Sequence, residues 1–203
     1  MAIPRWSSLT TPSGVVFFLL AMCFSLSAKA NDVAQRAQQI CASCHGASGI
    51  SSIPGMPSLA GQPKVFIENQ LVMIREGLRE IPAMKGILNG LSDPDVTALA
   101  KWYADQPLAP SPARSPDAAK LARGATLAKQ ALCGTCHLPS YLGQNQVPRL
   151  AGQREDYLLT TLTLMRDGKA QGRDSLMTNA LGGISDAQLS ELAHYFAHHV
   201  GKP

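Results

Sequence analysis

The sequence has few aromatic residues and few charged ones. Aromatic side chains make up 5% of the 203 residues and charged ones 16%, and the formal net charge is only +4. No stretch concentrates Lys and Arg into a basic face, which disfavours a nucleic-acid-binding protein. A core with so few aromatic rings fits either a plain helical domain or a domain whose volume is filled by a large cofactor.

The chain also lacks an apolar run long enough for a membrane-spanning helix near its amino terminus. The stretch from Val15 to Leu26 falls short of the roughly 20 residues that such a helix needs. It follows Arg5 and precedes Ala28-Lys29-Ala30, which has the small-x-small form that signal peptidase cuts. We therefore predict a secretory signal over residues 1–30, cleaved after about Ala30; a retained anchor is the alternative.

Beyond the predicted signal, the sequence has no cysteine outside one repeated motif. The four remaining cysteines lie in two copies of Cys-x-x-Cys-His, at Cys41–His45 and Cys133–His137. This spacing suits c-type haem, because two thiols can bond to the two vinyl groups while the next histidine presents an imidazole to iron. A redox dithiol would not need the histidine. A zinc site would place the two pairs about 15 to 20 residues apart, and these lie 92 apart.

The motif is part of an internal duplication. Pro57–Gln62 recurs as Pro148–Gln153, and Arg75-Glu76-Gly77 recurs as Arg166-Asp167-Gly168. The order is kept and the spacing drifts by about one or two residues, which is typical of a tandem repeat. Between the copies, residues 107–116 contain four prolines and are predicted to be a linker. The predicted domains are residues 31–106 and 117–203.

Both repeats are predicted to be all-α, because no stretch shows sustained alternation of apolar and polar residues. The last helix of the first repeat should begin at Ser92, in capping-box spacing with Asp95, and that of the second at Ser185, with Gln188. Their predicted core stripes are Val96, Leu99, Ala100 and Tyr103, and Leu189, Leu192, Ala193 and Phe196. Further helices are expected at about Asp32–Ala42, Lys64–Arg75, Pro116–Gly134 and Glu155–Arg166.

Two methionines are candidates for the second axial ligand of each haem. Met84 and Met177 are the methionines that stand at equivalent positions in the two repeats, each in a predicted loop about forty residues after its histidine. Methionine sulfur is a soft ligand that raises the reduction potential of haem iron. The rival ligands are His194, His198 and His199, which we predict to be surface residues.

The sequence resembles the dihaem cytochrome c4 family. The resemblance rests on the duplicated Cys-x-x-Cys-His, Pro-x-Leu-Ala-Gly-Gln and Arg-(Glu/Asp)-Gly segments, together with the matched methionines and capped helices. The resemblance covers nearly all of residues 31–203. It implies two tandem class I cytochrome c folds related by a pseudo-twofold axis, in the bacterial periplasm. It also implies the site residues: thioethers at Cys41, Cys44, Cys133 and Cys136, proximal ligands His45 and His137, and distal ligands Met84 and Met177.

The same resemblance implies secondary features of each domain. Pro57 and Pro148 match segments whose backbone lies on the histidine side of the haem. Gly124 is expected to permit a close helix crossing in the second repeat, and the first repeat has no such glycine. The aromatic residues of the last helices are expected to be core residues; they are Trp102, Tyr103, Tyr195 and Phe196.

The predicted function is an electron carrier with two covalently bound haem c groups, and not an enzyme. Iron with two protein ligands has no open position for a substrate, so outer-sphere electron transfer is expected. The predicted partners are a terminal oxidase, a quinol-oxidising cytochrome bc complex or a dehydrogenase, with no nucleic acid; peripheral contact with a membrane is compatible with these. The alternatives are the cytochrome subunit of a flavocytochrome c sulfide dehydrogenase, or a dihaem enzyme, such as a peroxidase or thiosulfate dehydrogenase, with an open haem site.

Overall fold

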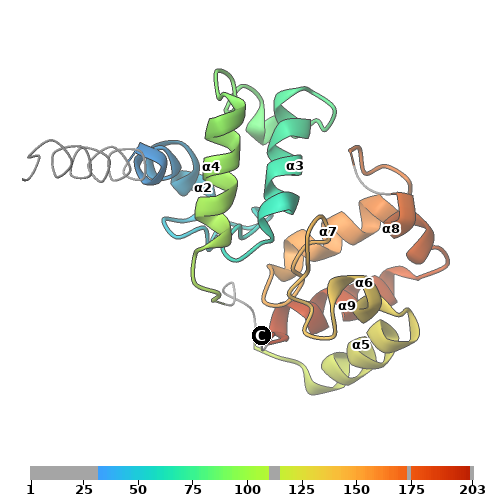
Figure 1. Ribbon diagram of the computed structural model, residues 1–203. Coiled ribbons are helices and arrows are strands. Elements are labelled where there is room, and N and C mark those ends of the chain that lie inside the picture. The colour runs from blue at the N-terminus through green and yellow to red at the C-terminus, as the bar shows by residue number, and fades with distance from the viewer. Residues whose placement is uncertain (1–31, 110–114, 173–174, 202–203) are drawn as a thin grey trace, which may run out of the picture.

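The computed structural model describes residues 32–109, 115–172 and 175–201 as two helical domains (Figure 1). The predicted signal, residues 1–30, and the centre of the predicted linker, residues 110–114, lie outside this described part. Within it, the backbone forms no strand, only an isolated bridge between Gln144 and Val147, which confirms the all-α prediction. No described helix is long and apolar enough to cross a membrane.

The first domain is built from short helices around two longer ones. Residues 32–36 are helical and continue without a break into η1 (Ala37–Cys41), a π-helical turn, and α2 (Ala42–His45). The longer helices, α3 (Lys64–Arg75) and α4 (Asp93–Ala104), pack together, and η2 (Pro82–Met84) lies between them in sequence. The predicted bounds of α3 agree with the structure.

The second domain repeats this order, with the α-helix α8 in the place of the 3-10 turn η2. It consists of α5 (Ala118–Gln130), α6 (Cys133–His137), α7 (Glu155–Arg166), α8 (Ser175–Ala180) and α9 (Asp186–His198). Helix α9 packs on both α5 and α7. Gly124 of α5 makes the crossing close, since a Cβ there would lie 2.3 Å from the carbonyl oxygen of Glu191. The predicted role of this glycine is therefore confirmed.

Capping boxes start the last helix of both domains. The Ser92 side chain accepts from the Asp95 amide and the Asp95 carboxylate accepts from the Ser92 amide; Ser185 and Gln188 make the same pair. These bonds satisfy amides that the first helical turn would otherwise leave unpaired. The predicted stripes of both helices are buried, and each domain has its own apolar cluster.

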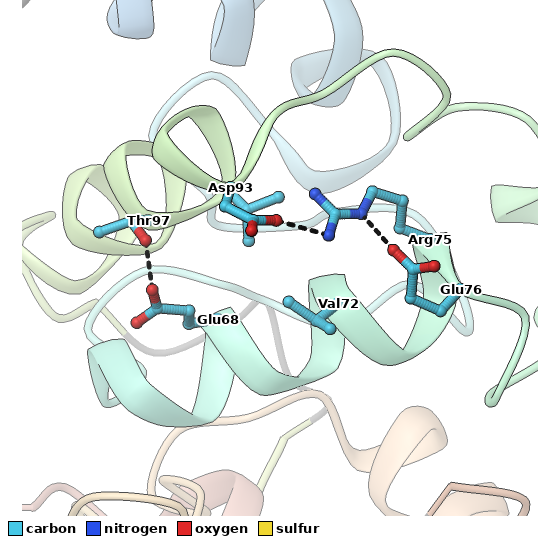
Figure 2. Close-up of a pocket in the computed structure, with 7 residues that line it drawn as sticks. Glu68, Val72, Arg75, Glu76, Asp93 and Thr97 are labelled. Carbon is cyan, nitrogen blue, oxygen red and sulfur yellow. Dashed lines mark hydrogen bonds and ion pairs between the residues drawn. The ribbon is translucent and has the colours of Figure 1, made fainter.

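The repeated Arg-(Glu/Asp)-Gly segment connects the middle helix to the last one. Arg75, at the end of α3, donates to the carbonyl of Leu91 at 3.0 Å and to the carboxylate of Asp93 at 2.7 Å, beside the first turn of α4 (Figure 2). Arg166 makes the equivalent bonds to Ile184 and Asp186. The shallow pocket in Figure 2 is thus lined by structural ion pairs and contains none of the predicted haem ligands.

Candidate functional site

Each Cys-x-x-Cys-His segment forms a short helical turn whose histidine is buried. His45 ends α2 and is 7% exposed, and His137 ends α6 and is 3% exposed. The first cysteine of each pair, Cys41 or Cys133, packs against the core of its own domain, while Cys44 and Cys136 are exposed. Burial raises the pKa of Cys41 and Cys133, which favours the thiol form.

One nitrogen of each buried imidazole is held by the backbone. Nδ1 of His45 lies 2.9 Å from the carbonyl oxygen of Pro57, and Nδ1 of His137 lies 2.8 Å from that of Pro148. Since a carbonyl can only accept, Nδ1 carries the proton and Nε2 holds the lone pair. Burial also lowers the pKa of both histidines, against the opposing effect of these bonds. Each ring is therefore in the neutral form that binds a metal.

The second ring nitrogen of His137, Nε2, is suited to bind haem iron. Its Nε2 is buried and has no hydrogen-bond partner. A buried polar atom without a partner costs free energy, so such an atom in a folded protein calls for an explanation. Coordination to haem iron supplies one, and the adjacent cysteines would hold the porphyrin through thioether bonds. The residues present thus fit a covalently attached haem.

The two matched methionines lie on short helical turns before the last helix. Met84 ends η2 and is partly buried against the first core; Met177 lies in α8 and is partly buried against the second. The loop prediction was therefore wrong for Met177, whose segment forms six residues of α-helix. Met84 and Met177 as distal ligands remain predictions.

His194, a rival ligand, was wrongly predicted to be a surface residue. It is 4% exposed, because it lies on the face of α9 that packs against α5 and α7. Its Nδ1 lies 3.0 Å from the carboxylate of Glu155, and its Nε2 accepts from the Asp117 amide at 3.0 Å. With both ring nitrogens in use, His194 is a structural residue. Because Nε2 accepts from an amide, Nδ1 carries the ring proton, so His194 offers no lone pair to a metal ion beside Glu155 and His198.

The segment after each histidine is held by the last helix of its own domain. The amide of Gly61 donates to the carbonyl of Tyr103, and that of Gly152 to Phe196, both at 2.9 Å. Both glycines have positive φ, +61° and +64°, which a residue with a Cβ rarely adopts. This explains the Gly of the repeated Pro-x-Leu-Ala-Gly-Gln segment.

The glutamine of the same segment crosses to the other domain, a role that the sequence reasoning missed. Gln62 bonds to both backbone groups of Arg149, and Gln153 bonds to both backbone groups of Ser58. Ser58 and Arg149 are themselves equivalent in the repeat, so the contact is reciprocal, as a pseudo-twofold axis requires. The identical glutamines at equivalent positions of the two repeats were the only sequence signal for this role.

Two arginines add further bonds across this polar interface. Arg149, which is 2% exposed, donates to the carbonyls of Ala151 and Ala60. Its Nε is buried without a partner, and burial lowers its pKa to about 10. Arg154 donates to the carbonyl of Ser51 at 3.3 Å. Within the described residues the Arg149 side chain donates only to carbonyls, and a haem carboxylate would supply the anionic partner that a buried cation requires.

Comparison with known proteins identifies the two domains. Residues 28–102 match the family model described as cytochrome c oxidase, cbb3-type, subunit III, and residues 121–199 match the model for cytochrome c. The fold and the buried histidine sites therefore define a c-type cytochrome with two domains.

Similar proteins narrow the class further. The chain is 31% identical over 164 residues to cytochrome c4 of Pseudomonas aeruginosa, covering 77% of this chain and 82% of that protein. It is 32% identical over 167 residues to the thiosulfate dehydrogenase electron acceptor of Thiomonas intermedia, covering 77% of each. The crystal structure of reduced recombinant cytochrome c4 from Pseudomonas stutzeri matches with a TM-score of 0.76 at 26% identity, covering 84% of this chain and 98% of that one.

This chain belongs to the dihaem cytochrome c4 family. It has two cytochrome c domains and two covalently bound haem c groups, and it is a dihaem electron-transfer cytochrome.

Proposed function

We propose that the chain is a periplasmic electron carrier of a respiratory chain, exported by the signal over residues 1–30, and that it is not itself an enzyme. Each haem would be bound by one pair of cysteines, Cys41 and Cys44 or Cys133 and Cys136. The proposed axial ligands are His45 with Met84 in the first domain and His137 with Met177 in the second. The bound haem supplies the reversible change between ferric and ferrous iron.

The buried, unpartnered Nε2 of His137 is the observation that carries the proposal. It supports a strong histidine ligand, which the proline carbonyl orients from the opposite side of the ring. The matched methionines support a second ligand in each domain, which would leave no coordination position for a substrate. A site of this kind transfers electrons with little rearrangement, as a carrier requires.

The proposed redox partners are an electron-donating cytochrome bc complex or dehydrogenase and a terminal oxidase. A second candidate donor is an enzyme that oxidises thiosulfate. Two relatives are named as thiosulfate dehydrogenase electron acceptors, from Thiomonas intermedia and Stutzerimonas stutzeri, at 32% and 33% identity. In that role the chain is still a carrier, and the donor enzyme performs the substrate chemistry.

Ligand binding and reduction separate these possibilities. The holoprotein, made with the cytochrome c maturation machinery, should not bind carbon monoxide when reduced, because both axial positions are filled. Thiosulfate alone should leave it oxidised. Rapid reduction by thiosulfate only when a thiosulfate dehydrogenase is present would support the second donor. Carbon monoxide binding at either haem, or reduction by thiosulfate alone, would contradict the carrier proposal and favour an enzyme.

A further inference from the structure

We propose that Gln62 and Gln153 are positioning residues that set the reduction potential of the haem in the opposite domain. Each acts through a single peptide group on the histidine of that domain. The inference rests on the proposed function, because it takes His45 and His137 as iron ligands.

The peptide group between Pro57 and Ser58 is hydrogen-bonded at both ends. Its carbonyl oxygen accepts from Nδ1 of His45 at 2.9 Å, and its N–H donates to Oε1 of Gln153 at 2.8 Å. The first partner belongs to the same domain and the second to the other domain. A continuous chain of bonds therefore runs from the imidazole of the first domain to a side chain of the second.

The second domain has the same arrangement with the roles exchanged. The peptide group between Pro148 and Arg149 accepts from Nδ1 of His137 at 2.8 Å and donates to Oε1 of Gln62 at 2.9 Å. Two glutamines at equivalent positions of the repeat thus make equivalent bonds to the two histidine-bound peptide groups.

The orientation of each glutamine amide is fixed by its backbone partners. Gln153 donates from Nε2 to the Ser58 carbonyl at 2.8 Å, and Gln62 donates from Nε2 to the Arg149 carbonyl at 3.0 Å. Since a backbone N–H can only donate and a carbonyl can only accept, Oε1 must face the N–H in both cases. Oε1 of Gln153 also accepts from the Arg154 amide at 2.9 Å, which further holds its position.

Hydrogen bonds in series polarise one another, and the effect grows where water is excluded. The residues of these hydrogen-bond chains that meet at the domain interface are buried: Ser58, Gln62, Arg149 and Gln153 are each 4% exposed or less. An acceptor at the N–H end of a peptide group increases the negative charge on its carbonyl oxygen. That oxygen then attracts the Nδ1 proton more strongly and makes the imidazole a stronger electron donor. A stronger donor stabilises ferric iron, so each glutamine should lower the potential of the haem across the interface.

The test uses the holoprotein with Gln153→Met or Gln62→Met, since methionine has a similar length and cannot make either bond. Gln153→Met should raise the midpoint potential of the His45 haem and leave that of the His137 haem unchanged. Gln62→Met should do the reverse. The potentials are measured by redox titration followed by NMR, in which the ring signals of each histidine identify its haem. In the fully reduced protein, the Nδ1 proton of the affected histidine should also move upfield as its bond to proline weakens.

The two variants are matched controls for each other. Each removes an equivalent pair of bonds across the interface, and Gln153→Met also removes the bond from the Arg154 amide within its own domain. A loosened interface alone would therefore change the two haems in the same way in both variants. Equal shifts, or no shift, would overturn the inference.

The carboxylate variants Gln153→Glu and Gln62→Glu keep an oxygen acceptor at the N–H and should move the Nδ1 proton in the opposite direction, downfield. They remain informative if a methionine variant does not fold.

Failure of the proposed function can be distinguished from failure of the inference about the glutamines. If the wild-type spectra show that either haem lacks histidine and methionine ligation, the carrier proposal is overturned before any glutamine variant is made. If both haems have these ligands and the shifts do not cross between domains, only the inference about the glutamines is overturned.

Discussion

The two domains share the framework around the histidine but differ in how their helices are connected. In both, a proline carbonyl holds Nδ1 and an arginine joins the middle helix to the last one. The first domain enters its Cys-x-x-Cys-His turn through a continuous helix, whereas the second breaks at Leu132, with φ +54°. The duplicated elements are thus those that position the buried histidine, and the connections between helices have diverged.

A second difference lies in the ion pairs that join the helices. In the second domain Glu155 of α7 contacts His194 of α9 at 3.0 Å and Lys120 of α5 at 3.3 Å, so one carboxylate joins three helices. The equivalent positions of the first domain hold Lys64 and Lys101, which cannot form this connection. The second domain should therefore respond to acid at a site that the first one lacks.

The largest expected difference between the domains comes from the close crossing of α5 and α9. Gly124→Ala should destabilise the second domain by up to about 3 kcal/mol, because the new Cβ would lie 2.3 Å from the Glu191 carbonyl oxygen and 2.6 Å from Cβ of Tyr195. Amide hydrogen exchange read by mass spectrometry measures the two domains separately. Asp32→Ala is the control at the equivalent position and should change neither domain. A small effect of Gly124→Ala would show that the helices separate easily.

The Glu155 connection predicts an intermediate effect that depends on pH. Burial opposes the ionisation of Glu155, but the bonds and charges of His194 and Lys120 outweigh it and lower its pKa. Its contribution is therefore complete above the ordinary carboxyl pKa of about 4.3 and is lost as pH falls below that value. Glu155→Gln should cost the second domain about 1 kcal/mol at pH 7, since one charged hydrogen bond is lost at a partly solvated site.

The pH dependence provides the control for that variant. Denaturant unfolding between pH 3 and pH 7 should show a weaker acid dependence in the second domain of Glu155→Gln than in wild type. The first domain, followed by the fluorescence of Trp102, the single tryptophan after residue 30, should be unaffected. An unchanged pH profile in the second domain would exclude Glu155 as the acid-sensitive group.

The smallest expected effect concerns the break before α6. Leu132 is 70% exposed and has φ +54°, a conformation that costs leucine about 1 to 2 kcal/mol and that asparagine tolerates better. Leu132→Asn should therefore stabilise the second domain by roughly 0.5 kcal/mol, seen as a small rise in its thermal midpoint. A lower midpoint would mean that the leucine side chain makes contacts that outweigh the backbone strain.

Much of the fold could be predicted from the repeated sequence, because local rules determine it. The capping boxes at Ser92 and Ser185 and the apolar stripes behind them fixed both last helices. The buried state of His194 could not be predicted, because it depends on Glu155 and Asp117, which are distant in sequence. Its counterpart in the first domain is Lys101, so the comparison of repeats pointed to the surface.

The histidine sites could also be predicted from the sequence, whereas the contacts at the domain interface could not. The Cys-x-x-Cys-His motifs were recognised from spacing alone. The family resemblance implied that the backbone at Pro57 and Pro148 lies on the histidine side of the haem, but not that its carbonyls bond to Nδ1. The crossing of Gln62 and Gln153 was not expected, since a pseudo-twofold axis does not specify which side chains meet across it. The helical state of Met177 also escaped prediction, because its short segment has no cap or apolar period long enough to be detected.

The proposed ligation places one haem of each domain between its histidine and its matched methionine. It is tested most directly by the oxidised visible spectra of wild type, Met84→Ala and Met177→Ala, in the weak far-red band that reports the bond between ferric iron and methionine sulfur. Wild type should contain two low-spin haems, and each variant should lose about half of this band, because one haem of the two loses its methionine. A band that either variant leaves intact, or a high-spin haem in the wild-type protein, would contradict it.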